Sequence, residues 1–218
     1  MKKINIAAFF ALAAGVLTLF IISAFFHFYT YNDDGSIHGD WRANESVIYL
    51  GTARLVSAVS GIVLALGIAA FFISQDKLAR KQNIAGALIL ALGAIAIIGS
   101  LTAFYPCTEM MKMNDRPMRC YWTMKLLLVL AGAISVSGVL MMLLGKSKEF
   151  LKGMNSAVIM FGCLFVLAPL KITEGFCSSM TGSHPCLDRF RPFTIMIGFI
   201  ILAVSVINCF ILFKKSAR

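Results

Sequence analysis

The segment from Cys120 to Lys148 reads CYWTMKLLLVLAGAISVSGVLMMLLGKSK. Between Trp122 and Leu144 its only charged residue is Lys125, which stands close to one end. A helix needs about 20 predominantly apolar residues to cross the roughly 30 Å of hydrocarbon in a bilayer. A cysteine precedes this run and lysines follow it, so its two ends differ chemically. The sequence therefore predicts a transmembrane helix whose ends can be assigned to opposite sides of a membrane.

Five more segments have the same apolar character and a similar length. The six predicted spans cover residues 4–27, 49–74, 84–105, 122–144, 154–170 and 192–213. Of the 218 residues, 59% are hydrophobic and 14% are charged, whereas a soluble domain carries about a quarter charged residues. The fold class is therefore predicted to be an all-α, polytopic transmembrane bundle of six spans arranged as three hairpins.

The formal net charge of +10 is placed at the ends of the apolar runs. A nucleic-acid surface would instead show a basic patch with interleaved aromatic residues, so we expect the lipid bilayer as partner and no nucleic acid.

The segments that flank and connect the apolar runs fall into two classes that differ in their content of basic residues. One class holds both termini and the 75–83 and 146–153 segments, with eleven basic residues against two acids. The other class, loops 28–48, 106–121 and 171–191 together with Arg54 and Lys125 just inside the neighbouring spans, has nine basic residues against eight acids. Loops rich in lysine and arginine stay in the cytoplasm, so this asymmetry predicts cytoplasmic termini and three outward loops in the inner membrane of a bacterial cell.

The first apolar run follows Lys2 and Lys3, as the core of a signal peptide would. The run is longer than a usual signal core, and no small-x-small cleavage site follows it. We therefore expect it to be retained as the first span.

Two spans begin alike. Thr52 and Arg54 open the second span, and Thr123 and Lys125 open the fourth, each pair just inside the outward boundary. The last hairpin offers Arg189 and Arg191 at the same depth. Arg54, Lys125, Arg189 and Arg191 are therefore the candidate functional residues, an outward cationic layer. Such a layer could receive an anionic headgroup or a small anion, or it could be ordinary anchoring of long side chains at the interface.

Four of the six cysteines lie in the outward loops, in two pairs. Twelve residues separate Cys107 from Cys120, and eight separate Cys177 from Cys186. Thiols outside the cytoplasm oxidise and persist as disulfides, so we predict a disulfide within each loop, with pairing between the loops as the alternative.

Two chemical readings compete with a structural role for these loops. A thiol oxidoreductase would use the cysteine pairs, although neither has the Cys-x-x-Cys spacing of a reactive pair. A copper site would use thioether ligands from the methionines Met110, Met111, Met113 and Met118. We predict no catalytic residues, no metal site and no cofactor, and keep the thiol-redox or copper-handling protein as the alternative.

Within the spans, Asn208 is costly in lipid and is expected to hydrogen-bond a neighbouring helix.

The loop residues also carry a resemblance. The runs FYPC at 104–107 and MRCYWT at 118–123, with GFC at 175–177, Cys186 and Pro192, resemble a bacterial membrane family catalogued as domain of unknown function 4418. The resemblance covers about 84–213. It implies a four-span body at 84–218, to which a hairpin with an acidic and aromatic loop is added at 1–83. The long Met-rich insert between Cys107 and Cys120 also departs from the pattern of the family that the chain resembles, and so does Lys125.

The resemblance further implies an accessory subunit of the kind found beside exporter-type ABC permeases. We therefore predict a non-enzymatic membrane protein that acts as a partner of a transport system, with an ABC-type permease as the possible partner.

Overall fold

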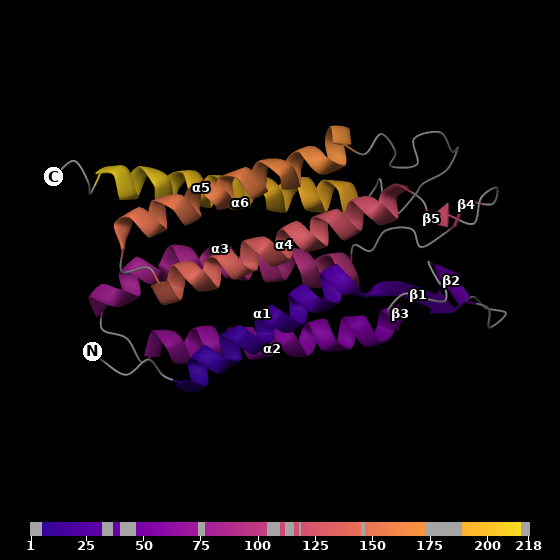
Figure 1. The fold of residues 1–218 in the computed structure, drawn as a ribbon, viewed down its shortest axis with the longest axis horizontal. Coiled ribbons are helices and arrows are strands. Elements are labelled where there is room, and N and C mark those ends of the chain that lie inside the picture. Colours follow the sequence, from indigo (N-terminus) through magenta and orange to yellow (C-terminus); the bar gives the residue numbers. More distant parts are fainter. Residues whose placement is uncertain are drawn as a thin grey trace.

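The computed structural model describes residues 6–31, 37–39, 47–73, 77–103, 110–111, 116–117, 119–144, 147–172 and 189–214. Within these ranges the six long helices are α1 (Ile6–Phe25), α2 (Leu50–Ile73), α3 (Lys77–Thr102), α4 (Arg119–Leu144), α5 (Lys148–Leu167) and α6 (Arg191–Lys214). All six are long and apolar enough to cross a membrane. The predicted six-span helical bundle is confirmed (Figure 1).

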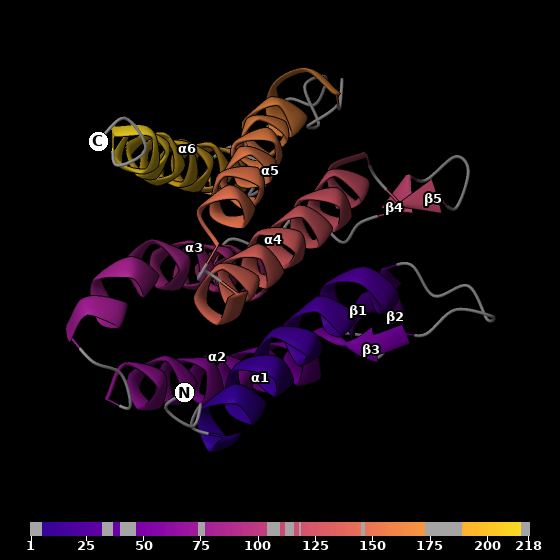
Figure 2. The same cartoon turned by 60° about the vertical axis from the view of Figure 1, so that its left-hand side comes forward.

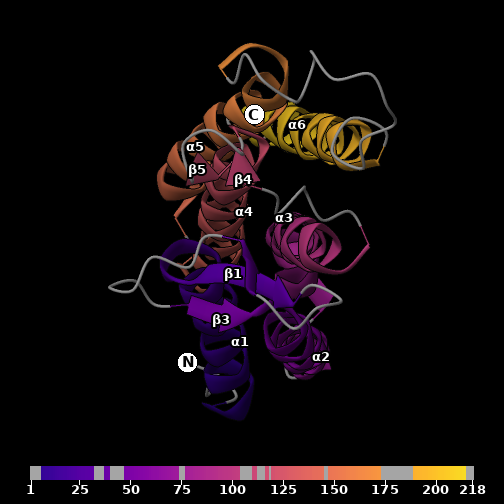
Figure 3. The same ribbon diagram turned by 90° about the vertical axis from the view of Figure 1, so that its right-hand side faces the viewer.

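The helices form three antiparallel hairpins, α1–α2, α3–α4 and α5–α6, as predicted. The α3–α4 hairpin lies in the middle, because α4 contacts α1 and α5 while α3 contacts α2 and α6. The bundle is therefore two rows of three helices, α1–α4–α5 and α2–α3–α6 (Figures 2 and 3). Burial follows from this order: 67% of the α4 span is buried inside the bundle, against 22% of the α6 span.

Short strands at one end of the bundle were not predicted. Strands β1 (His27–Tyr31), β2 (Ile37–Gly39) and β3 (Val47–Tyr49) form a sheet in the order β2-β1-β3. β1 pairs antiparallel with β2 and parallel with β3. A second ribbon joins β4 (Met110–Met111) to β5 (Arg116–Pro117). Aromatic and β-branched residues, which favour strands, dominate β1 and β3. We call this the strand end of the bundle; α1 begins and α6 finishes at the opposite end (Figure 1).

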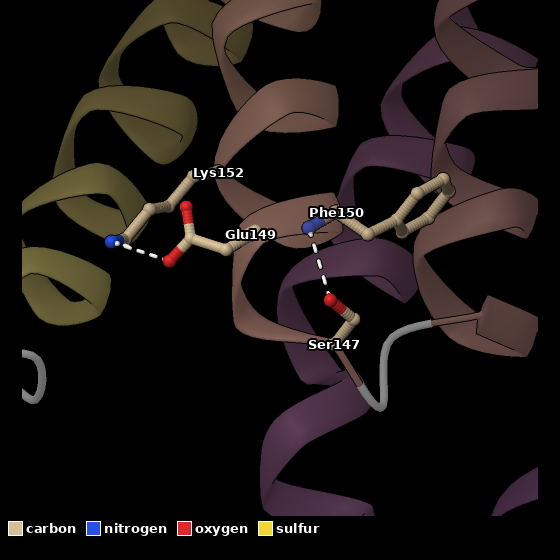
Figure 4. A network of polar contacts seen from close by, with 4 residues as sticks. All are labelled: Ser147, Glu149, Phe150 and Lys152. Atoms are coloured by element: carbon tan, nitrogen blue, oxygen red, sulfur yellow. Dashed lines mark hydrogen bonds and ion pairs between the residues drawn. The ribbon is translucent and has the colours of Figure 1, made fainter.

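Two helices begin well before the boundaries that hydropathy suggested. α3 begins at Lys77 and α5 at Lys148, whereas the predicted spans began at residues 84 and 154. At α5 the cause is visible (Figure 4): Ser147 has an extended backbone, and its Oγ accepts a hydrogen bond from the Phe150 backbone nitrogen at 3.4 Å. Glu149 in the first turn pairs with Lys152 at 3.0 Å. Capping and first-turn charge start a helix where hydropathy is still low.

At its other end α5 runs into a π-helical turn, η1 (Ala168–Ile172), which contains Pro169. Proline has no backbone N–H and its ring clashes with the carbonyl four residues earlier, so a regular α-helix cannot continue through it. The change to a π-helical turn at this position is the expected response.

The α3–α4 pair, which has the most extensive contact in the bundle, depends on glycine. A Cβ atom built on Gly138 would lie 2.5 Å from the Leu90 backbone nitrogen and 2.7 Å from the Gly86 carbonyl oxygen. A Cβ atom on Gly86 would lie 2.9 Å from the Gly138 carbonyl oxygen. Small residues allow transmembrane helix backbones to approach this closely, and van der Waals packing then holds them together in lipid.

The glycine contact can be tested with Gly138→Ala. The added methyl group meets backbone atoms, so the free energy of unfolding in detergent should fall by about 1–3 kcal/mol. Gly153→Ala is the matched control, because nothing lies within 4 Å of a Cβ atom built on Gly153 in α5. Equal effects of the two substitutions would contradict the close contact.

Candidate functional site

Lys125 lies in the second turn of α4, at the strand end, and is 7% exposed. Its Nζ donates hydrogen bonds to the carbonyl oxygen of Ser23, at 3.0 Å, and to that of Phe26. Ser23 lies in the last turn of α1, and Phe26 directly follows the last residue of that helix. The last carbonyls of a helix have no partner within the helix, and the helix dipole makes that end attractive to a cation. Lys125 therefore caps a helix of another hairpin.

Arg54 does the same for α3. It lies in the second turn of α2, and its Nε donates to the carbonyl oxygen of Leu101 at 2.7 Å. Leu101 is the penultimate residue of α3.

The two caps are reciprocal. The α1–α2 hairpin supplies Arg54 to the end of α3, and the α3–α4 hairpin supplies Lys125 to the end of α1. The similar openings of the second and fourth spans, Thr52 with Arg54 and Thr123 with Lys125, thus occupy equivalent structural positions. We call this pair of contacts the reciprocal cap.

The other two residues of the predicted cationic layer lie at the start of the last helix. Arg189 is exposed and Arg191, the first residue of α6, is partly exposed. The structure therefore places all four cations at the strand end but gives them different surroundings. Lys125 and Arg54 bond to helix ends, while Arg189 and Arg191 stand where α6 begins.

The loop residues predicted to carry sulfur chemistry lie mostly outside the described part of the chain. This applies to Cys107, Cys177, Cys186, Met113 and Met118. Met110 and Met111 form β4, and Cys120 lies in the first turn of α4. The disulfides and the copper alternative stay predictions. Cys163 and Cys209, in α5 and α6, are free thiols. No cluster of three or more His, Cys, Asp or Glu residues is found within the described ranges.

A second polar contact joins α5 to α6. Asn208 Nδ2 donates to Asn155 Oδ1 at 3.0 Å, which confirms the expected bond to a neighbouring helix. Asn155, fully buried, donates in turn to the Ser205 carbonyl oxygen at 2.8 Å. Asn155 was not predicted, because it stands one residue inside the predicted fifth span and beside polar residues. The signal in the sequence that could have identified Asn155 was its side-chain amide, because a buried amide needs a hydrogen-bond partner.

Fold and composition together define a multi-pass helical membrane protein in contact with the bilayer. Residues 89–211 match the family described as a domain of unknown function (DUF4418). The chain belongs to this family. No curated protein matches the chain, and no solved structure matches it. The matched residues run from α3 to α6, so Arg54 and the helices α1 and α2 lie outside them while Lys125 lies inside.

The importance of the reciprocal cap can be tested with Lys125→Met. This change leaves buried carbonyls of α1 without a donor, so we expect the free energy of unfolding to fall by about 2–4 kcal/mol. Lys152→Met is the control: the Glu149 partner of Lys152 is 81% exposed, and such surface pairs contribute at most about 1 kcal/mol. Chemical denaturation of both variants in one detergent gives the comparison, and equal stability would contradict the role of Lys125.

Sidedness can be tested with thiol labelling. In a variant with Cys163→Ser and Cys209→Ser, a membrane-impermeant maleimide should label reduced Cys107 and Cys186 in intact cells, because the charge asymmetry predicts outward loops. Labelling that appears only after lysis would reverse the predicted orientation.

Proposed function

We propose that this chain is a non-enzymatic subunit of a membrane transport system, with an exporter-type ABC permease as its partner. The observation that carries the proposal is how its intramembrane polar groups are used. Lys125, Arg54, Asn155 and Asn208 all hydrogen-bond groups on neighbouring helices. Charged and polar groups along a transport path would instead face a water-filled cavity. These contacts suit a rigid scaffold.

The shape of the bundle supports a partner role. The central hairpin is covered on both sides, whereas α2 and α6, at the two ends of one row, are only 28% and 22% buried across their spans. A partner helix could pack on either flank without disturbing the central hairpin. The predicted outward surface, with Arg189 and Arg191 at the start of α6, would then face the envelope side of the assembly.

The proposal predicts co-purification from membranes of the native host. A tagged full-length chain extracted in mild detergent should bring down one permease at a fixed ratio, and the tagged permease should bring down the chain. Lys125→Met should reduce the recovered permease severalfold because it loosens the scaffold, while Lys152→Met should leave recovery unchanged. Isolation of the chain alone, in both directions and after chemical cross-linking, would contradict the proposal.

A further inference from the structure

Two arginines at the start of α6 differ from the other cations of the bundle. Arg54, Lys125 and Lys152 each donate a hydrogen bond to an oxygen of another residue. Within the described ranges, no hydrogen bond or ion pair joins the guanidinium group of Arg189 or of Arg191 to another residue. Arg189 is exposed and Arg191 is partly exposed. A guanidinium group is always charged and has five N–H donors, so these two groups can bind an anion from outside the chain.

The residues around the two arginines fix the backbone that carries them. Phe190, which stands between them, is fully buried. Phe193 packs against α3, since a Cβ atom built on Gly99 would lie 2.4 Å from its ring. Thr194 is also buried, and its Oγ1 donates to the Arg191 carbonyl oxygen at 2.9 Å. The start of α6 is therefore held against the bundle, and an anion bound there would meet a preformed backbone.

The depth of α6 in a membrane determines which anions the arginines meet. Its apolar span runs from Arg191 to Leu212 and contains 22 residues. At about 1.5 Å per residue this span is roughly 33 Å long, close to the roughly 30 Å of hydrocarbon in a bilayer. Arg191 therefore lies at the edge of the hydrocarbon, where lipid phosphates are found, and its long side chain can reach them. This holds for either orientation of the chain in the membrane.

The surface of α6 that follows the arginines suits lipid tails. Only 22% of the α6 span is buried inside the bundle. Met196, Phe199 and Ile200 are exposed and lie within about three helical turns of Arg191. In a bilayer, acyl chains cover apolar side chains of this kind. A lipid whose tails lie on this surface brings its phosphate to the level of Arg189 and Arg191.

The charge of the arginine pair favours one class of lipid. Two guanidinium groups only two residues apart concentrate two positive charges. Arginine binds a phosphate through two parallel hydrogen bonds, which fixes the geometry of the contact. In a zwitterionic lipid the phosphate charge is balanced by the lipid's own ammonium group, whereas an anionic phospholipid keeps a net negative charge that attracts basic residues. Charge complementarity therefore favours an anionic phospholipid.

We propose that Arg189 and Arg191 bind the phosphate group of an anionic phospholipid whose acyl chains lie along α6. The site lies within residues 89–211, the part of the chain that matches the family. This inference does not rest on the proposed function, because a lipid can occupy the site whether or not the chain has a permease partner.

The test is native mass spectrometry of the full chain in detergent, titrated with phosphatidylglycerol or with phosphatidylcholine of the same acyl chains. The first phosphatidylglycerol should bind roughly tenfold more tightly than the first phosphatidylcholine. Arg189→Gln and Arg191→Gln should each weaken phosphatidylglycerol binding about fivefold, and the double variant about 25-fold. Lys152→Gln is the matched control: Lys152 pairs with Glu149 near the start of α5, at the other end of the bundle, so this change should leave binding unaltered.

Two further measurements separate the lipid site from simpler explanations. Arg189 is exposed, so Arg189→Gln tests the site even where Arg191→Gln lowers the stability of the bundle. Arg189→Lys keeps the charge but loses the planar fork, and should weaken binding by about two- to threefold. Glycerol phosphate, which has the phosphate but no acyl chains, should not displace the lipid at an equal concentration.

Three results would overturn the inference. The first is equal binding of the two lipids, and the second is an unchanged affinity for phosphatidylglycerol in the double variant. The third is displacement of the lipid by an equal concentration of glycerol phosphate, which would show a site for small anions instead of a lipid.

Discussion

A helix that ends within or near the hydrocarbon of a bilayer has carbonyl groups with no water to bond, and this constraint organises the first four helices. Leaving such groups unsatisfied costs several kcal/mol each, so a donor must come from the protein. The C-terminal ends of α1 and α3 receive it from Lys125 and Arg54. Because each donor belongs to the opposite hairpin, satisfying the helix ends also fixes which hairpins are neighbours.

The reciprocal cap also links the part of the chain that matches the family to the part that does not. Residues 89–211 match, so Lys125 lies inside the match and the first hairpin lies outside it. In the structure Lys125 contacts the first hairpin directly, at Ser23 and Phe26. The lysine in α4 and the added α1–α2 hairpin are thus two halves of one contact. Lys125 and Arg54 are therefore used to hold the bundle together. Of the predicted cationic layer, this leaves Arg189 and Arg191 as the residues that could bind an anion.

Different kinds of contact join the helices within each hairpin and join one hairpin to the next. Close backbone contact at Gly86 and Gly138 joins α3 to α4, charge-assisted bonds join the first hairpin to the second, and the Asn155–Asn208 bond joins α5 to α6. Polar contacts of this kind are strong determinants of which helices pair in lipid, where all apolar faces are otherwise equivalent. The result is a well-packed centre with flanking helices whose lipid-facing surfaces are large.

The sequence by itself determined the number of spans, their approximate limits and the three hairpins, because the transfer of an apolar segment into lipid depends mainly on that segment's own composition. It missed the early starts of α3 and α5; at α5 the Ser147 cap and the first-turn Glu149 extend the helix beyond its apolar part. It named Arg54, Lys125 and Asn208 as notable, yet only the tertiary structure decided what each one contacts. The bond of Arg54 joins residues 47 positions apart, and one bond of Lys125 joins residues 102 positions apart. A local pattern carries no information on such pairs, because the distance between them is set by how whole hairpins pack.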